Sequence, residues 1–476
     1  MRTIEMKKNV SIINTILFFD LIGTFFCVVK SFQISQYSFW ILPVLYTIFL
    51  IFTQMNRRMT VGNTGALILN VTMSVRYVLI PVIYYATNKL SRFARNYNNV
   101  ENAIWLMVYE MVVLMIVLEI SARKYWRKEN SIKYVQQRYI KLKDGVIISF
   151  IVFAIVFGLA VTYKDLGAGF RVIITGTLEQ SVNSVNSNIL DIVWETLSTW
   201  IYVYLIMREA EKYEQDSKPV HSTVAIIYTF AFVLITFIQS VAFSRWYTII
   251  SATAAVTCLF KLFPQYRKKI FYSIVVPTIL LLILITSYKN AGYTIGETKF
   301  SDSLANIFSS SNFDSYFAGP VNVSNAIGVK KNYTNLGIWT ILSDMFNNMP
   351  IVNHYMDITQ TSVYSYNASI GRIWNGSGDQ IMPLLGQSII YFGYIAAPTM
   401  GVIAILLMRK FDYLFKRSKS YMMYLCAFLA VWFSVEPMML NFTINIAWFY
   451  IRIIPFAIAF AVTDKISTKQ YIESES

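Results

Sequence analysis

Residues 103–120 read AIWLMVYEMVVLMIVLEI, an almost wholly apolar run, and the basic cluster Arg123-Lys124-Tyr125-Trp126-Arg127-Lys128 follows it closely. A helix of about 20 apolar residues crosses the roughly 30 Å of hydrocarbon in a bilayer. Clusters of Lys and Arg stay on the cytoplasmic side of such helices. The stretch therefore predicts a transmembrane helix whose C-terminal end lies in the cytoplasm.

The same pattern recurs along the whole chain. Apolar residues make up 56% and charged residues 14% of the 476 residues, so the polar groups are too few to cover a water-facing surface. The sequence predicts an all-α, polytopic membrane helix bundle that forms a single integral membrane domain over residues 1–476. We expect about twelve transmembrane helices, near residues 10–29, 38–53, 61–86, 103–120, 145–162, 190–206, 222–243, 246–260, 270–287, 384–408, 421–437 and 441–463.

The placement of the basic residues predicts the orientation. With the N-terminus inside, the predicted cytoplasmic segments hold 27 Lys and Arg residues and the external segments hold 12, while Arg76 and Arg452 lie within predicted helices. This bias predicts that both termini are cytoplasmic. It also explains the net charge of +15 by topology, so the expected partner is the lipid bilayer and not nucleic acid. For most charges inside helices, such as Arg76, we expect structural ion pairs.

One external segment is much longer than the others. Residues 288–383 are rich in Ser, Asn, Gly and Tyr and include apolar stretches such as Leu336–Leu342. Loops of this length usually carry function. We therefore expect a large external loop with short helices of its own.

Three arginines on the predicted external side are candidates for binding an anion: Arg171, Arg245 and Arg372. The planar guanidinium group matches the oxygens of a phosphate and keeps its charge at every physiological pH. The structural alternative is that each arginine anchors a helix end to lipid headgroups or pairs with a carboxylate.

Two external residues are candidates for a general base. Asp379 follows Gly376-Ser377-Gly378 just before a predicted helix, and His354 is the lone external imidazole. Either group can take a proton from an attacking hydroxyl. If neither does so, the base has to be sought among Glu297, Asp302, Asp344 and Glu436.

Common cofactor and metal signatures are missing from the sequence. There is no P-loop, G-x-G-x-x-G, H-E-x-x-H or G-x-S-x-G motif. Cys27, Cys258 and Cys426 all lie in apolar runs without metal-ligand spacing. We therefore predict neither a cofactor nor a metal ion.

Several short motifs, in order, carry a resemblance to a known family. Tyr316-Phe317-Ala318-Gly319-Pro320-Val321 is similar to a Tyr-x-x-Gly-Pro-Ile element, and Ser244-Arg245-Trp246 is similar to an external Ser-Arg turn. Two further stretches are similar to the family's loop and its return to the membrane: Asn335 to Pro350, and Gly378 to Pro383 followed by Tyr391-Phe392-Gly393. With the layout of helices, the chain resembles the bacterial Wzy-type polymerases of O-antigen and capsular repeat units.

The resemblance implies a GT-C-like glycosyltransferase of the bacterial cytoplasmic membrane with its active face outside. The donor would be a glycan on undecaprenyl pyrophosphate and the acceptor a single lipid-linked repeat unit. A flippase and a chain-length regulator would be its protein partners. In this setting Arg245 and at least one of Arg171 and Arg372 would bind the pyrophosphate, and Asp379 or His354 would act as the base.

Other classes of protein remain as alternatives. A lipid-linked oligosaccharide flippase or another transporter would show internal pseudo-symmetry and short loops, and the long external loop argues against it. A glycan ligase shares the layout and differs in its acceptor. A membrane acyltransferase would be expected to have a histidine within the membrane, and neither His221 nor His354 lies in a predicted helix.

Overall fold

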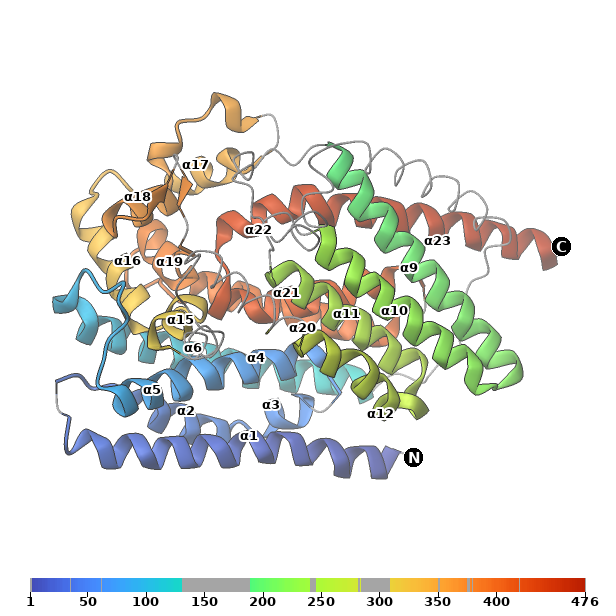
Figure 1. Cartoon of the computed structure of the whole chain (residues 1–476), viewed down its shortest axis with the longest axis horizontal. Coiled ribbons are helices and arrows are strands. Elements are labelled where there is room, and N and C mark those ends of the chain that lie inside the picture. The colour runs from blue at the N-terminus through green and yellow to red at the C-terminus, as the bar shows by residue number, and fades with distance from the viewer. Residues whose placement is uncertain are drawn as a thin grey trace, which may run out of the picture. The chain divides into compact units, whose positions relative to one another are not determined.

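In the residues that the structure describes, the fold is helical apart from loops and one two-stranded antiparallel ladder (Figure 1). The computed structural model describes residues 2–34, 36–60, 62–130, 189–239, 245–280, 283, 309–349, 352–374, 377–378, 380–418 and 420–475. It forms two compact units. Unit 1 comprises Met1–Lys133, Leu304–Tyr413 and Ala430–Ala447, and unit 2 comprises Tyr134–Ser303, Leu414–Leu429 and Trp448–Ser476.

Several helices have the length and the apolar composition of transmembrane helices. Among the described residues, six are long and apolar enough to cross one: Ile13–Ser31, Thr64–Thr87, Tyr97–Lys128, Pro219–Thr236, Met422–Met439 and Phe442–Lys465. A seventh candidate is the pair Trp246–Leu262 and Pro264–Leu280, which is bent by 114°. Pro264 lies at this bend, where its ring and its missing N–H oppose a continuous helix. The chain is therefore a membrane-embedded helical protein, as predicted.

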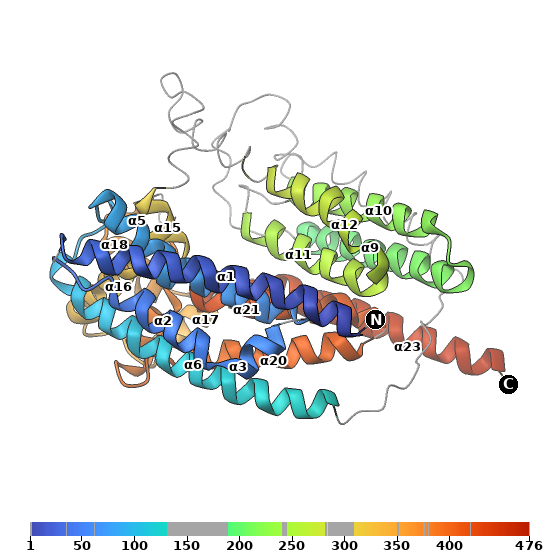
Figure 2. The ribbon, with the colours of Figure 1, turned by 90° about the horizontal axis from the view of Figure 1, so that it is seen from below.

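Unit 1 begins with the long helices of the N-terminal part. Figures 1 and 2 show α1 running alongside α2 and α5. Asn88 ends α5 in the left-handed region, at φ 49°, and its N–H donates to the carbonyl of Tyr84. The elements are α1 (Arg2–Ser31), α2 (Ile41–Phe52), α3 (Gln54–Thr60), α4 (Thr64–Ser74), the π-turn η1 (Val75–Leu79), α5 (Ile80–Thr87), η2 (Tyr97–Asn99) and α6 (Val100–Asn130).

The predicted external loop contributes short helices to unit 1, as expected. They gather at the end of the unit opposite the N-terminus of α1 (Figures 1 and 2). The elements are α15 (Ser310–Tyr316), α16 (Pro320–Asn332), α17 (Thr340–Asn347), η6 (Val352–Tyr355), η7 (Ile358–Gln360), α18 (Ser362–Ser369), β1 (Ile373–Trp374) and β2 (Ser377–Gly378). β1 and β2 pair antiparallel.

The predicted helix at 384–408 is broken in the structure. α19 (Leu384–Phe392) ends at Gly393, and α20 (Thr399–Arg417) starts after Pro398. Gly393 has φ 79°, a value that glycine adopts readily. Its N–H still donates to the carbonyl of Ile389 at 2.9 Å. The apolar run therefore contains two helices joined by a turn over residues 393–398.

The remaining elements complete the chain. In unit 2, α9 (Ile189–Asp216) and α10 (Pro219–Gln239) form an antiparallel hairpin (Figures 1 and 2). The predicted helix at 145–162 lies outside the described residues. The other elements are α11 (Arg245–Leu262), η4 (Pro264–Tyr266), α12 (Arg267–Ile270), η5 (Phe271–Val275), α21 (Met422–Met439), α22 (Phe442–Trp448), η8 (Phe449–Ile453) and α23 (Ile454–Glu475).

Candidate functional site

Arg372 is the predicted anion-binding residue that the structure describes fully. It follows Gly371, which has φ 69°, and its N–H donates to the carbonyl of Asn367 at 2.8 Å. This turn directs the chain from α18 into β1. The guanidinium carbon lies 4.5 Å from the centroid of the Phe93 ring, within the range of a cation–π contact.

A second arginine approaches the same ring. The guanidinium carbon of Arg92 lies 4.9 Å from the Phe93 centroid. Phe93 is only 8% exposed, whereas Arg92 and Arg95 are exposed. Within the described part of the chain, no carboxylate forms an ion pair with Arg92 or Arg95. Two guanidinium groups therefore share one aromatic ring, and the charge of Arg92 is available to an anion.

The segment that carries Arg92 is held by the predicted external loop. The N–H of Arg92 donates to Ser311 Oγ at 2.9 Å. Asn325, which is fully buried in α16, accepts from the N–H of Arg95 at 3.2 Å and donates to the carbonyl of Phe93 at 3.0 Å. Because both groups of one amide are used, the 91–95 segment has a defined position on α16.

The start of α16 is fixed by a buried carboxylate. Asp314 accepts from the N–H groups of Val321 at 3.1 Å and Asn322 at 3.2 Å. These are donors that the first turn of a helix leaves free. Burial raises the pKa of Asp314 to about 7, although the two N–H groups oppose that shift. Gly319 is needed here, because a Cβ atom on it would lie 2.3 Å from Asp314 Oδ1.

The segment just before α16, Tyr316–Val321, also contacts a charged side chain from a predicted transmembrane helix. Arg76, fully buried in the π-turn η1, donates through Nε to the carbonyl of Ala318 at 3.0 Å. Its Nη1 lies 2.9 Å from a carboxylate oxygen of Glu110. The expected structural pairing of Arg76 is therefore confirmed. Ala318 has φ 49°, an uncommon value for a residue other than glycine.

Asp344, one of the alternative bases, has a structural place. It is fully buried, and it accepts from the N–H of Ser362 at 3.0 Å and from the hydroxyl of Tyr391. Burial raises its pKa to about 6. Gln387 extends the network by donating to Ser362 Oγ at 3.0 Å. Asp344 thus joins α17, α18 and α19 and does not face a solvent-filled site.

The other candidates are only partly described. Arg171 and Asp379 lie outside the described residues, as do Glu297 and Asp302. Arg245 begins α11 in unit 2, and His354 lies in η6 of unit 1, but their side chains also lie outside the described residues. Glu436 is 6% exposed and accepts from the side-chain amide of Asn445.

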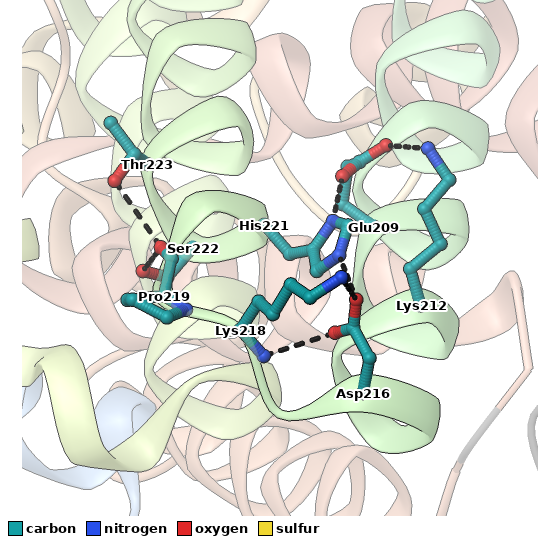
Figure 3. A network of polar contacts seen from close by, with 8 residues as sticks. All are labelled: Glu209, Lys212, Asp216, Lys218, Pro219, His221, Ser222 and Thr223. Carbon is teal, nitrogen blue, oxygen red and sulfur yellow. Dashed lines mark hydrogen bonds and ion pairs between the residues drawn. The ribbon is translucent and has the colours of Figure 1, made fainter.

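Unit 2 contains a separate polar network at the joint between α9 and α10 (Figure 3). His221 Nδ1 lies 2.7 Å from Glu209 Oε2, and Nε2 lies 3.2 Å from Asp216 Oδ2. Burial raises the pKa of Glu209, but hydrogen bonds with Lys212 and His221 outweigh it, so the pKa is lowered. The Lys218 N–H, above all, lowers the pKa of Asp216 to about 2. The imidazole therefore links the two helices.

Arg92 is not among the anion-binding candidates that the sequence predicts. From the sequence alone it is one of the basic residues of the predicted external segments, and these residues indicate the topology. A local signal is present in Arg92-Phe93-Ala94-Arg95, where an aromatic residue lies between two arginines in a short predicted external segment.

Comparison of the chain with models of protein families, with curated proteins and with solved structures finds no match.

Proposed function

We propose that this protein is a membrane glycosyltransferase that polymerises undecaprenyl-pyrophosphate-linked repeat units into O-antigen or capsular polysaccharide. In this proposal the chain has about twelve transmembrane helices in a GT-C-like layout, lies in the bacterial cytoplasmic membrane and acts on the external face. The observation that carries it is the pair of guanidinium groups of Arg92 and Arg372 around Phe93. They lie on segments that the charge pattern assigns to the outside.

The reaction needs a cationic site of this kind. A sugar hydroxyl of the acceptor attacks the anomeric carbon of the donor glycan, and the new C–O bond replaces the bond to undecaprenyl pyrophosphate. The departing pyrophosphate gains negative charge, which arginines stabilise in the transition state. The hydroxyl proton passes to a general base. In this proposal Arg92 and Arg372 bind the pyrophosphate, and Asp379 or His354 is the base. The roles predicted for Arg171 and Arg245 stay predictions.

The location of the family-like motif supports the same proposal. Asp314 and Arg76 hold the Tyr316–Val321 segment from its two sides, and Asn325 of the helix that follows holds the Arg92 segment. The motif and the helix that follows it therefore position the segment that carries Arg92. Such a support keeps cationic groups in place before substrate arrives, as electrostatic catalysis requires.

The decisive test is deletion of the gene in its own bacterium, followed by analysis of the lipid-linked and surface glycans. We expect loss of long polymer with retention of single capped repeat units, and restoration by the intact gene. Loss of both forms would indicate a flippase. Polymer that accumulates on its lipid carrier would indicate a ligase.

A second arm uses the purified protein in liposomes with lipid-linked repeat units. Formation of a ladder of polymer without any other protein would support the polymerase directly. No ladder from a folded protein that complements the deletion would contradict direct polymerisation.

A further inference from the structure

Asp20 lies near the middle of the apolar part of α1, on the one buried stripe of that helix. Along this stripe it comes seven residues after Ile13 and seven before Cys27. Asp20 is 4% exposed, whereas its neighbours Phe19 and Leu21 are 65% and 46% exposed. An ionised carboxylate inside a membrane helix is costly unless a partner compensates its charge.

Among the described residues, no cation compensates the charge of Asp20. Its hydrogen-bond partner is the hydroxyl of Ser74, which donates to Oδ2 at 2.9 Å. Arg76, two residues further along the chain, is already paired with Glu110 at 2.9 Å. The elements that pack against α1 carry these titratable or charged side chains: Tyr46, Arg57, Arg58, Arg76, Tyr77, Tyr84 and Tyr85. None of the arginines in this set forms an ion pair with Asp20, so its surroundings differ from those of Glu110.

A row of polar groups begins at Ser74 and continues through the apolar helices. Ser74 Oγ lies 3.4 Å from the hydroxyl of Tyr46, and this hydroxyl donates to the backbone carbonyl of Asn70 at 3.1 Å. The side-chain amide of Asn56 donates to Asn70 Oδ1 at 3.3 Å. Tyr46, Asn70 and Asn56 are all buried. Hydrogen bonds therefore connect Asp20 through α4 and α2 to α3.

The row reaches the end of unit 1 that the charge pattern assigns to the cytoplasm. The N–H of Asn56 donates to Glu119 Oε2 at 3.0 Å, and Glu119 pairs with Arg123, whose side chain is 64% exposed. In the opposite direction, the ring of Tyr77 lies 5.7 Å from that of Tyr46. No hydrogen bond between described side chains joins Tyr77 to the row. The polar connection from the buried carboxyl group therefore leads to the predicted cytoplasmic end.

We propose that Asp20 is a proton-binding site that holds a proton at neutral pH and exchanges it with the cytoplasm along this row. The protonated carboxyl group is neutral, which removes the cost of a buried charge. It keeps an acceptor for the hydroxyl of Ser74 and gains an O–H donor. The hydroxyls of Ser74 and Tyr46 can both donate and accept, as the transfer of a proton requires. The inference does not rest on the proposed glycosyltransferase activity.

The first test uses dicyclohexylcarbodiimide on the purified full chain in nanodiscs of a neutral lipid. The acid proton passes to a nitrogen of the reagent, the carboxyl oxygen bonds to its central carbon, and rearrangement leaves a stable N-acylurea. Mass spectrometry of peptides should find this adduct on Asp20, with a rate that falls as pH rises from about 5 to 9, because the protonated form declines. Glu110, which is buried but paired with Arg76, is the internal control and should stay unmodified.

Infrared spectroscopy makes the second test independent of access for the reagent. The C=O stretching band of a protonated carboxyl group should be present near neutral pH and lost in Asp20→Asn, a neutral replacement that should fold. Asp216→Asn, at an exposed position outside the row, should keep the band. Tyr46→Phe removes one hydroxyl from the row, so it should keep the band but slow its shift when water is replaced by D₂O. Thr47→Val removes a buried hydroxyl that bonds to Thr24 outside the row, and it should exchange at the normal rate.

Three results would overturn the inference. A band near neutral pH that is unchanged in Asp20→Asn would show that Asp20 is ionised in the folded protein. Protection of Asp20 from the carbodiimide by NaCl at constant pH would show that a metal cation, and not a proton, occupies the site. An unaltered rate of deuterium exchange in Tyr46→Phe would contradict exchange along the row.

Discussion

Arg92 and Arg372 meet at one aromatic ring although 280 positions separate them, since the ring belongs to Phe93. Each guanidinium carbon lies within 5 Å of the ring centroid, so a cation–π contact can stabilise both charges in part. We predict that Arg92→Gln or Arg372→Gln lowers the rate of polymer formation by about 10²-fold or more, because each variant removes a donor from the leaving group. The rate is measured as ladder formation in liposomes.

The matched control is Lys89→Gln, which removes an exposed cation from the same predicted external segment without changing Phe93. Lys at position 92 or 372 should restore only part of the activity, because a point charge lacks the fork of the guanidinium group. Full activity in the Arg92→Gln, Arg372→Gln double variant would remove this pair from the site.

A second residue-scale prediction concerns the buried Arg76–Glu110 ion pair. Arg76→Ala leaves the carboxylate of Glu110 buried without a counter-charge, which typically costs about 3–5 kcal/mol. We expect a clear fall in the unfolding temperature in detergent and loss of the native position of Ala318. The double variant Arg76→Met, Glu110→Gln should regain most of the stability. A stable Arg76→Ala protein would show that the ion pair is dispensable.

The helix α16 depends on the hydrogen bonds of its first turn. Gly319→Ala would place a methyl group against Asp314 Oδ1 and Cγ, so the carboxylate could no longer hold the N–H groups of Val321 and Asn322. We predict a loss of stability of about 1–3 kcal/mol together with loss of polymer. Gly337→Ala is the control, because no atom lies within 4 Å of its added Cβ. Equal effects of the two substitutions would contradict this role of Gly319.

The network between α17, α18 and α19 predicts a dependence on pH. Asp344 has its pKa raised by burial to about 6, above its ordinary value of 3.8. Between these values the unfolded chain has released a proton that the folded chain keeps, so stability falls as pH rises through this window. Asp344→Asn should flatten the change of unfolding temperature between about pH 4 and 6. An unchanged slope would mean that Asp344 is already ionised in the folded protein.

Many helices could be predicted from apolar runs, because hydropathy alone decides which segments enter lipid. α6 covers its predicted range of 103–120, and the helix Thr64–Thr87 covers the predicted range of 61–86 except for its first three residues. The break at Gly393 could not be predicted in this way. The stretch from Tyr391 to Ile395 is as apolar as a segment inside a continuous helix, and an average of hydropathy over a window does not detect one residue with a positive φ angle. For Arg76, the sequence predicts that the side chain forms a structural ion pair, but it does not predict with which residue. Its partners Glu110 and Ala318 depend on tertiary packing that no local pattern encodes.

The proposed site requires that unit 1 is oriented in the membrane with its loop helices outside. α6 has 31 residues, which at 1.5 Å per residue is about 46 Å and exceeds the roughly 30 Å of hydrocarbon. Its two ends should therefore reach opposite sides of the membrane. The 27-to-12 split of basic residues assigns the Arg123–Lys128 end to the cytoplasm.

This orientation can be measured with single cysteines, because all three native cysteines are buried. The cell envelope outside the cytoplasmic membrane is first made permeable, while the cytoplasmic membrane stays intact. A membrane-impermeant maleimide should then label Lys89→Cys and Ser310→Cys. It should label Lys124→Cys only after the cytoplasmic membrane has been permeabilised. Lys89 and Lys124 are both exposed, so access to the reagent and not burial decides the result. Labelling of Lys124→Cys from outside would reverse the topology and place the Arg92–Arg372 pair in the cytoplasm, where a polymerase of externally displayed repeat units could not use it.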